Sequence, residues 1–209
     1  MSPPLIHVDN VRGALSVHRP QLVSGPETPF ASVAMILTGA RSDPEVLFIE
    51  RARREGDRWS GQMAFPGGRV EESDRDLRDT AERETSEEVG IDLGGAELLG
   101  RLDDQGGRRF GDSTASFIAA YVYYLAKAPA LELSHEVEEA LWVPAVTLTD
   151  PASRVQYELE DAVESFPGIL VGRPDRHIVW GLTYRMVGTF LDVVGAPWVD
   201  RHDERFYDH

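Results

Sequence analysis

The chain has 209 residues, of which 42% are hydrophobic and 27% are charged; it contains no cysteine and carries a formal net charge of −15. This length and composition predict one globular domain with a full core, and the missing cysteines exclude disulfides, thiolate metal sites and cysteine nucleophiles. The charge argues against nucleic acid and anionic membranes as partners, because both would repel so acidic a protein.

The N-terminal sequence MSPPLIHVDN has neither a basic start nor an apolar stretch, so we expect no secretory signal and a cytoplasmic location. No apolar run approaches the roughly 18 residues of a membrane span. We expect three parts: an N-terminal extension over 1–29 that packs on the core, a domain over 30–196 and a C-terminal tail over 197–209.

Two apolar runs rich in β-branched residues, 30–39 and 45–51, predict strands that the turn-like ARSDP joins into a hairpin. The polar segment RARREGDRWSGQ then predicts a loop. After this loop, MAFPGG predicts a short strand that Pro66, Gly67 and Gly68 end.

A helix is expected over about residues 74–89. Ser73 or Asp74 can cap its start, and Gly90 is a suitable C-terminal stop. The segments AELLGRLDD and TASFIAAYVYYLA predict further strands, of which the second is long enough to be central.

The C-terminal third predicts an acidic loop, a short strand and a turn in EVEEALWVPAVTL, and later a second helix. Ile178, Leu182, Met186 and Phe190 recur every four residues, a pattern typical of an amphipathic helix with one buried face. The order of strands, one helix, more strands and a last helix predicts an α/β fold of the α+β type rather than a regular βαβ repeat.

The predicted helix near the middle of the chain collects three carboxylates, Glu84, Glu87 and Glu88. At about 100° per residue, Glu84 and Glu88 continue the face that Leu77 and Ala81 turn toward the core. An inward carboxylate costs roughly several kcal/mol unless something pairs with it. The alternative is a solvated acidic helix that its own arginines partly neutralise.

The orientation of these glutamates, together with the Pro-Gly-Gly turn before the helix, favours a metal site. Glycine lets backbone carbonyls and a ligand approach closely. Carboxylate and carbonyl oxygens suit Mg²⁺ or Mn²⁺, and such sites most often serve phosphoryl chemistry.

Residues 67–91 resemble the signature of the Nudix hydrolases: a glycine, an acidic residue, Arg-Glu, two glutamates and a closing glycine plus aliphatic residue. RETSEEVGI at 83–91 matches the second half of that signature at every defined position. The resemblance implies a Nudix domain over 30–196, with a mixed β-sheet sandwiched between helices.

The spacing from Gly68 to Arg83 is one residue longer than in the commonest Nudix form. The acidic residue of the first half then falls at Asp74, or at Glu71 or Glu72 if the extra residue lies later. The longer spacing, with DRDLRDTAERE, resembles the coenzyme A diphosphatase branch.

The upstream segment RARREGDRWSGQMAFPGG resembles the second motif of that branch, which has spaced arginines, a glycine and Phe-Pro-Gly-Gly. Ile49 stands where this motif has a threonine, and the gap from Arg51 to Gly61 is one residue longer than expected. These two departures bear on the substrate rather than on the family.

The resemblance implies that Glu84, Glu87 and Glu88 coordinate Mg²⁺ or Mn²⁺, with the carbonyl of Gly67 as a further ligand. Arg83 is implied to join turn and helix by an ion pair rather than to touch substrate. The general base is then either a helix glutamate or a downstream one. The downstream candidates are Glu136, Glu138 and Glu139, for which a solvated acidic loop is the alternative.

The arginines at 51, 53, 54 and 58 form the one dense basic stretch of this acidic chain. They suit the 3′-phosphate or the diphosphate of coenzyme A, although an ordinary charged loop is the alternative. The expected substrate-binding residues are Arg51, Arg58, Phe65 and Gly68, with Trp59 as a second aromatic candidate; core packing is the alternative for Phe65.

Three functional hypotheses follow. The first is a hydrolase of coenzyme A or acyl-CoA that yields 3′,5′-ADP and 4′-phosphopantetheine. The second is a hydrolase of another nucleoside diphosphate derivative, such as ADP-ribose or a nucleotide sugar. The third is a Nudix domain that only binds a nucleotide and regulates a partner. All three imply a small-molecule nucleotide ligand, and a homodimer is left open.

Overall fold

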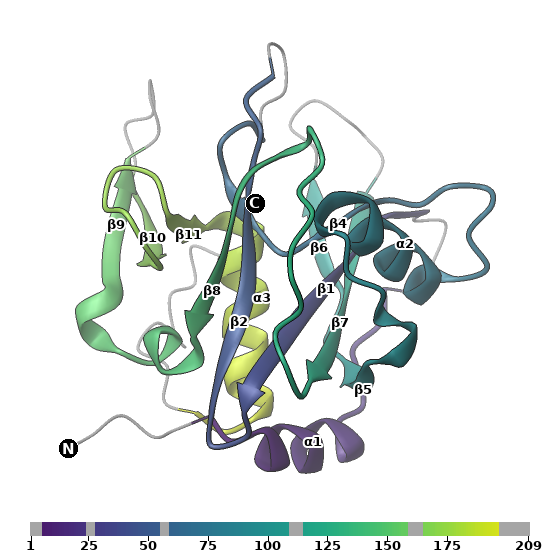
Figure 1. The fold of residues 1–209 in the computed structure, drawn as a ribbon, viewed down its shortest axis with the longest axis horizontal. Coiled ribbons are helices and arrows are strands. Elements are labelled where there is room, and N and C mark those ends of the chain that lie inside the picture. The colour runs from purple at the N-terminus through teal and green to yellow at the C-terminus, as the bar shows by residue number, and fades with distance from the viewer. Residues whose placement is uncertain (1–5, 24–27, 55–58, 109–114, 159–164, 197–209) are drawn as a thin grey trace.

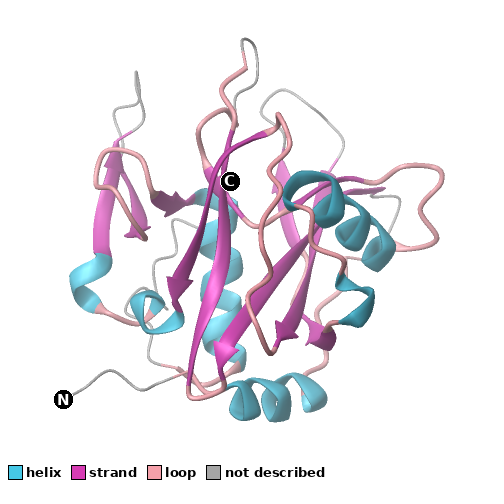
Figure 2. Ribbon diagram, in the orientation of Figure 1, coloured by secondary structure: helices cyan, strands magenta, loops and turns pink. Residues whose placement is uncertain are grey.

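The structure is a computed structural model that describes residues 6–23, 28–54, 59–108, 115–158 and 165–196. Within these ranges, an eight-stranded mixed sheet forms the centre, a three-stranded sheet lies beside it, and three α-helices cover them (Figures 1 and 2). The bounds of the helices are α1 (Val8–Val17), α2 (Leu77–Val89) and α3 (Gly181–Val193).

The large sheet has the strand order β3-β2-β1-β7-β5, with β4 paired to β1, β6 to β7 and β8 to β2. Its strands are β1 (Thr28–Ala40), β2 (Asp43–Arg51), β3 (Met63–Ala64), β4 (Gly67–Arg69), β5 (Glu97–Arg101), β6 (Gln105–Arg108), β7 (Ala115–Leu125) and β8 (Val137–Pro144). The pairing of β1 with β7 is parallel and the others are antiparallel, which makes the sheet mixed. The predicted β1–β2 hairpin and the interior position of β7 are both confirmed.

The smaller sheet follows β8 in the chain and is antiparallel, in the order β11-β10-β9. Its strands are β9 (Arg154–Glu158), β10 (Ser165–Leu170) and β11 (Ile178–Trp180). Strands β10 and β11 contact α3, so the smaller sheet and α3 lie side by side (Figure 1).

Helices cover both faces of the large sheet, as the predicted sandwich requires. On one face, Ala81 and Val89 of α2 pack against side chains such as Ile36 and Leu47. On the other face, α3 and α1 share a second apolar core. The alternation of side chains along β1 and β2 explains both cores, because successive residues of a strand point to opposite faces.

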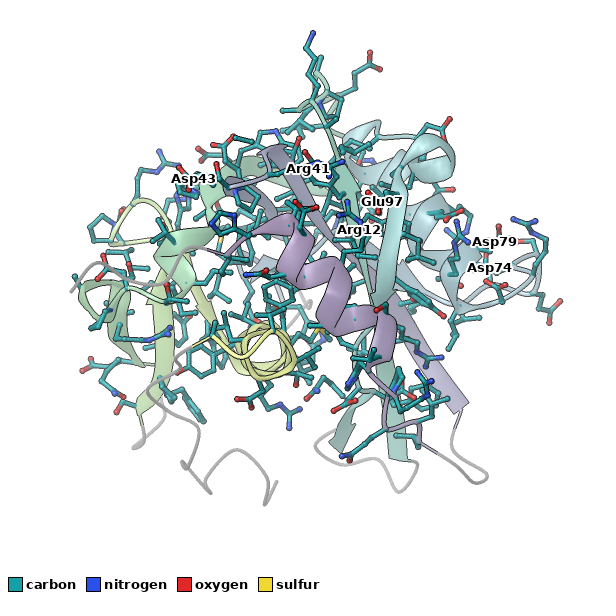
Figure 3. All side chains as sticks on the ribbon, turned by 90° about the horizontal axis from the view of Figure 1, so that it is seen from below. Arg12, Arg41, Asp43, Asp74, Asp79 and Glu97 are labelled. Atoms are coloured by element: carbon teal, nitrogen blue, oxygen red, sulfur yellow. The ribbon has the colours of Figure 1, made fainter. Side chains whose placement is uncertain are left out.

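Helix α1 belongs to the part of the expected N-terminal extension that the structure describes. Val11 and Leu15 are buried against the large sheet, and a Cβ on Gly100 of β5 would lie 2.9 Å from Leu15 Cβ. Arg12 donates to Glu97 of β5 at 2.9 Å, a contact visible from below in Figure 3. The helix is thereby fastened to the sheet by apolar burial and an ion pair.

The start of α2 differs from the prediction of a helix beginning near residue 74. The helix begins at Leu77, because the side chain of Asp76 accepts a hydrogen bond from the N–H of Asp79 at 2.9 Å and caps it. Asp74 is therefore not the cap, and neither is Ser73. The predicted stop is confirmed, since Gly90 adopts the left-handed conformation with φ of 72°.

The last predicted helix also starts later than expected. Ile178 lies in β11, where it pairs with Leu170 of β10, and α3 begins only at Gly181. Met186 and Phe190 are buried on α3 as predicted. The four-residue recurrence runs through the strand by coincidence, because periodicity alone does not mark where a helix begins.

Two loop predictions are corrected by strand pairing. Gly67 and Gly68 do not end a strand but form β4, which pairs with β1. Glu138 and Glu139 do not lie in an acidic loop but on β8, where Glu139 pairs with Glu50 of β2. In both cases hydrogen bonding to a distant strand overrides the local turn-like or charged composition.

Candidate active site

The two glycines of β4 permit an unusually close approach of other groups. Gly67 has φ of 150°, and a Cβ there would lie 2.4 Å from the carbonyl oxygen of Ser32. A Cβ on Gly68 would lie 2.4 Å from Cδ of Glu84 and 2.5 Å from both of its oxygens. Since real Cβ atoms do not approach this closely, glycine at both positions lets β4 lie directly against β1 and the Glu84 carboxylate of α2.

Glu88 is the most deeply buried of the three helix glutamates, with 2% of its surface exposed. Its Oε2 accepts a hydrogen bond from the N–H of Gly67 at 2.8 Å. Burial raises the pKa of Glu88 to about 7; the Gly67 N–H and the charge of Arg51 oppose this rise, while the charges of Glu84 and Glu136 add to it.

Glu84 also faces inward, and Glu87 lies to the side, as the helical wheel predicts. Burial raises the pKa of Glu84, and Arg83, at 3.0 Å from its Oε1, partly opposes the rise. The Glu87 side chain is 60% exposed and lies 3.2 Å from Arg83. The helix therefore presents two inward carboxylates and one at the rim.

Arg83 joins the turn before α2 to the helix. Its guanidinium donates to both carboxylate oxygens of Asp74, at 2.8 and 3.0 Å, and to the carbonyl of Arg69 at 3.0 Å. The Asp74 side chain is 2% exposed and also accepts from the Thr80 hydroxyl at 2.8 Å. Arg83 first of all holds the pKa of Asp74 well below its usual range. The signature spacing left Glu71, Glu72 and Asp74 as candidates for its acidic residue. Of these, Asp74 makes the close ion pair with Arg83.

The predicted substrate-binding residues do not all lie together. Arg51, at the end of β2, is close enough to Glu88 to lower its pKa. Phe65 is 2% exposed and stacks on Phe48 at 5.0 Å within the core on the α3 face, which favours the alternative of core packing for this residue. Arg58 lies outside the described residues. Trp59 is 47% exposed beside the loop that follows β2.

The candidate bases Glu136 and Glu139 have different neighbours. Glu136 raises the pKa of both Glu84 and Glu88, so it lies near them, and its carboxylate is 2.9 Å from Arg54. Glu139 instead contacts Arg173 and His177 on the face that Glu50 occupies. The structure thus brings Glu136 to the site and keeps Glu139 away from it.

A cluster that the sequence did not reveal consists of Glu50, Glu139 and His177, whose ligand atoms lie within 4.8 Å of one another. No other set of three or more His, Asp or Glu side chains in the described residues comes together this closely, the helix glutamates included. The three members come from distant segments, so local sequence carries no signal for the cluster. Arg176 pairs with Glu50, and Arg173 with Glu139.

The protonation of His177 makes this cluster unsuited to a metal. His177 Nδ1 accepts a hydrogen bond from the backbone N–H of Arg173 at 3.0 Å, so the neutral ring carries its proton on Nε2. Nε2 faces Glu139 at 3.4 Å and Glu50 at 3.6 Å. A metal needs a free lone pair on that nitrogen. The cluster is therefore an ion-pair network that offsets two carboxylates lying opposite each other on β2 and β8.

The helix glutamates fit a divalent cation better. Glu88 is a buried carboxylate that accepts a hydrogen bond from the backbone N–H of Gly67, and Glu84 lies in the space that Gly68 leaves open. Hard oxygen donors with unmet charge are what Mg²⁺ and Mn²⁺ bind. Without a cation, their mutual repulsion is limited by Arg83 and the Gly67 N–H.

Residues 28–162, well over half of the chain, match the family profile described as NUDIX domain. The chain belongs to the Nudix family. This match confirms the predicted family of pyrophosphohydrolases and its mixed sheet between helices. The match begins at the first residue of β1 and includes all the glutamates discussed above.

Several curated relatives of this Nudix chain cover it in part. A Schizosaccharomyces pombe protein named Uncharacterized protein C14C4.10c is 38% identical over 58% of this chain and 38% of its own length. The mouse protein named Mitochondrial coenzyme A diphosphatase NUDT8 is 36% identical over 34% of each chain. Klebsiella aerogenes NudL, named an uncharacterized Nudix hydrolase, is 30% identical over 49% of this chain and 84% of its own. The chain thus spans only about a third of the first two relatives.

A solved structure supports the fold. A MutT/nudix family protein from Enterococcus faecalis superposes with a TM-score of 0.53 over 88% of this chain and 68% of its own, at 19% identity. This Nudix likeness includes elements beyond the matched profile. In the described part of the chain, every helix is too short or too polar to cross a membrane.

Proposed function

We propose that the protein is a divalent-metal-dependent hydrolase of a diphosphate linkage, with coenzyme A or acyl-CoA as substrate and 3′,5′-ADP and 4′-phosphopantetheine as products. The observation that carries the hydrolase proposal is the pair of inward carboxylates, Glu84 and Glu88, held against the glycines of β4. The coenzyme A substrate is supported by the longer signature spacing and by the mouse relative's name.

Each side chain of the site has a distinct part in this proposal. Glu84, Glu87 and Glu88, with the carbonyl of Gly67, hold Mg²⁺ or Mn²⁺. When bound, the cation neutralises phosphate oxygens and makes water a stronger acid. Arg83 does not contact substrate, because its guanidinium is taken up by Asp74, Arg69 and the neighbouring glutamates.

The remaining groups act on substrate and on the attacking water. Glu136, close to Glu84 and Glu88, is the better placed downstream base and removes the proton of the water that attacks one phosphorus. Arg51 lies on the same side as Glu88 and suits a phosphate oxygen of the substrate. Displacement in line with the attack then releases two monophosphates.

A different nucleoside diphosphate substrate is the second candidate. Ile49 replaces the threonine of the coenzyme A motif, and in this structure it is completely buried in the core under α2. A side chain in that position cannot contact coenzyme A, so its departure from the motif does not decide between substrates. The third candidate, a domain that binds a nucleotide without catalysis, is disfavoured because all three helix glutamates are present.

A substrate panel tests these candidates. Purified protein is incubated with Mg²⁺ or Mn²⁺ and with coenzyme A, ADP-ribose or a nucleotide sugar, and the products are separated and identified. We expect 3′,5′-ADP from coenzyme A. Cleavage of ADP-ribose without cleavage of coenzyme A would favour the second candidate, and binding without any turnover would favour the third.

The cytoplasmic location and the homodimer stay predictions. Fractionation of cells tests the first, and light scattering on the purified protein tests the second.

A further inference from the structure

Ser32 on β1 buries a hydroxyl that has no partner. The residue is completely buried, and its Oγ makes no hydrogen bond within the described structure. By contrast, the buried hydroxyls of Thr38 and Thr85 each donate to a backbone carbonyl, at 3.0 and 2.7 Å.

An unpaired buried hydroxyl costs free energy, because the water it bonded in the unfolded chain is not replaced. A protein gains nothing from that cost unless the hydroxyl acquires a partner in another state. Alanine would fill almost the same volume at position 32 without the cost.

The strand register places the Ser32 hydroxyl beside the candidate metal site. Ser32 pairs directly with Gly68 of β4, and side chains of directly paired residues lie on the same face of a sheet. On that face the Glu84 carboxylate fills the space where a Gly68 side chain would be. Along β1, Ser32 also shares its face with Ala34 and Ile36, both of which belong to the core under α2.

We propose that Ser32 is a positioning residue for Glu84: with a divalent cation bound, its hydroxyl donates a hydrogen bond to the Glu84 carboxylate and orients it. This inference rests on the proposed function. Arg83 already donates to Oε1 of this carboxylate at 3.0 Å, and a serine hydroxyl, which rotates freely, supplies a second donor to it. The unpaired hydroxyl is the cost of keeping this donor in place.

The test compares two substitutions on one face of β1. Ser32→Ala removes the unpaired hydroxyl, and Thr38→Val removes a paired one that is six residues away on the same strand. For each purified protein, Mn²⁺ affinity is measured by calorimetry, and the urea midpoint of unfolding is measured without metal.

We expect Ser32→Ala to leave the urea midpoint unchanged or higher and to weaken Mn²⁺ binding about ten-fold. Thr38→Val should lower the midpoint and leave Mn²⁺ affinity unchanged. In a Glu84→Gln background, Ser32→Ala should have no further effect on Mn²⁺ affinity, because the group it positions is already altered. Weaker Mn²⁺ binding without a lower urea midpoint indicates a positioning residue. A lower urea midpoint with unchanged Mn²⁺ affinity indicates a residue that only stabilises the fold.

Three results would overturn the inference. One is wild-type Mn²⁺ affinity in Ser32→Ala while the unsubstituted protein binds Mn²⁺ and cleaves its substrate, in which case the proposed function stands. Another is a lower urea midpoint for Ser32→Ala, because the hydroxyl would then already have a partner. The last is an unsubstituted protein that neither binds Mn²⁺ nor cleaves a diphosphate, which also removes the proposed function.

Discussion

The carboxylate of Glu84 occupies the space that any side chain on Gly68 would need. The two residues are distant in sequence, yet a Cβ on Gly68 would lie 2.4 Å from Glu84 Cδ. This contact joins β4 to α2 at the candidate site, so Gly68 of β4 is required by the position of the Glu84 carboxylate.

Gly68→Ala is expected to displace Glu84 and to lower kcat/KM at least about 100-fold, because a shift of roughly 1 Å in a catalytic group has that effect. Mn²⁺ affinity measured by calorimetry should fall as well. Gly106→Ala is the matched control: Gly106 also lies in a strand of the large sheet, and a Cβ there meets nothing within 4 Å. Unchanged turnover in Gly68→Ala would show that Glu84 is not needed where it lies.

Glu88→Gln is expected to change how stability depends on pH in the metal-free protein. Because the pKa of Glu88 is raised to about 7 from an ordinary value of 4.5, its folded form favours the protonated state. Glu88 therefore contributes roughly 3 kcal/mol to the free energy of unfolding below pH 4.5. This contribution is lost as the pH rises from 4.5 through about 7.

Urea unfolding at pH 5 and pH 8 measures this effect. As the pH rises, the free energy of unfolding should fall more for the wild type than for Glu88→Gln, because only the wild type has the Glu88 carboxylate to ionise. Saturating Mg²⁺ should reduce that difference at pH 8, since a cation that binds the folded protein stabilises it. Parallel pH profiles for the two proteins would contradict the assignment of a raised pKa to Glu88.

Arg83→Ala is expected to lower the free energy of unfolding by about 2–3 kcal/mol at neutral pH, because it leaves the buried carboxylate of Asp74 without its cation. The pKa of Asp74 is lowered, so this stabilisation is present above its ordinary pKa of 3.8 and is lost as pH falls below it. A double-mutant cycle with Asp74→Asn measures the coupling. Arg75→Ala, which breaks an exposed pair with Asp79, is the control and should cost less than about 1 kcal/mol.

Glu136→Gln is expected to lower kcat by about 100-fold or more if this residue is the base, with little change in Mn²⁺ affinity. Glu139→Gln should leave kcat within about two-fold, because Glu139 contacts Arg173 and His177 and not the site. Steady-state kinetics of both variants decides the matter. A large loss in Glu139→Gln with none in Glu136→Gln would reverse the assignment.

The sequence was sufficient for the acidic helix and for the direction of its glutamates. Leu77, Ala81, Glu84 and Glu88 lie within a few turns of one helix, and helical geometry alone decides which of them share a face. Gly90 stops the helix by its own conformational freedom. The family could be predicted for the same reason, since its signature is contained in one short continuous segment.

The tertiary structure decided which residues meet this helix from elsewhere. Glu136 and Glu139 are three positions apart, but Glu136 precedes β8, whereas Glu139 lies within β8 and pairs with Glu50 of β2. Phe65 and Ser32 likewise differ in role only because one faces the α3 core and the other faces α2. Contacts within a few residues follow from local backbone geometry, whereas contacts between strands depend on register, which no single segment contains.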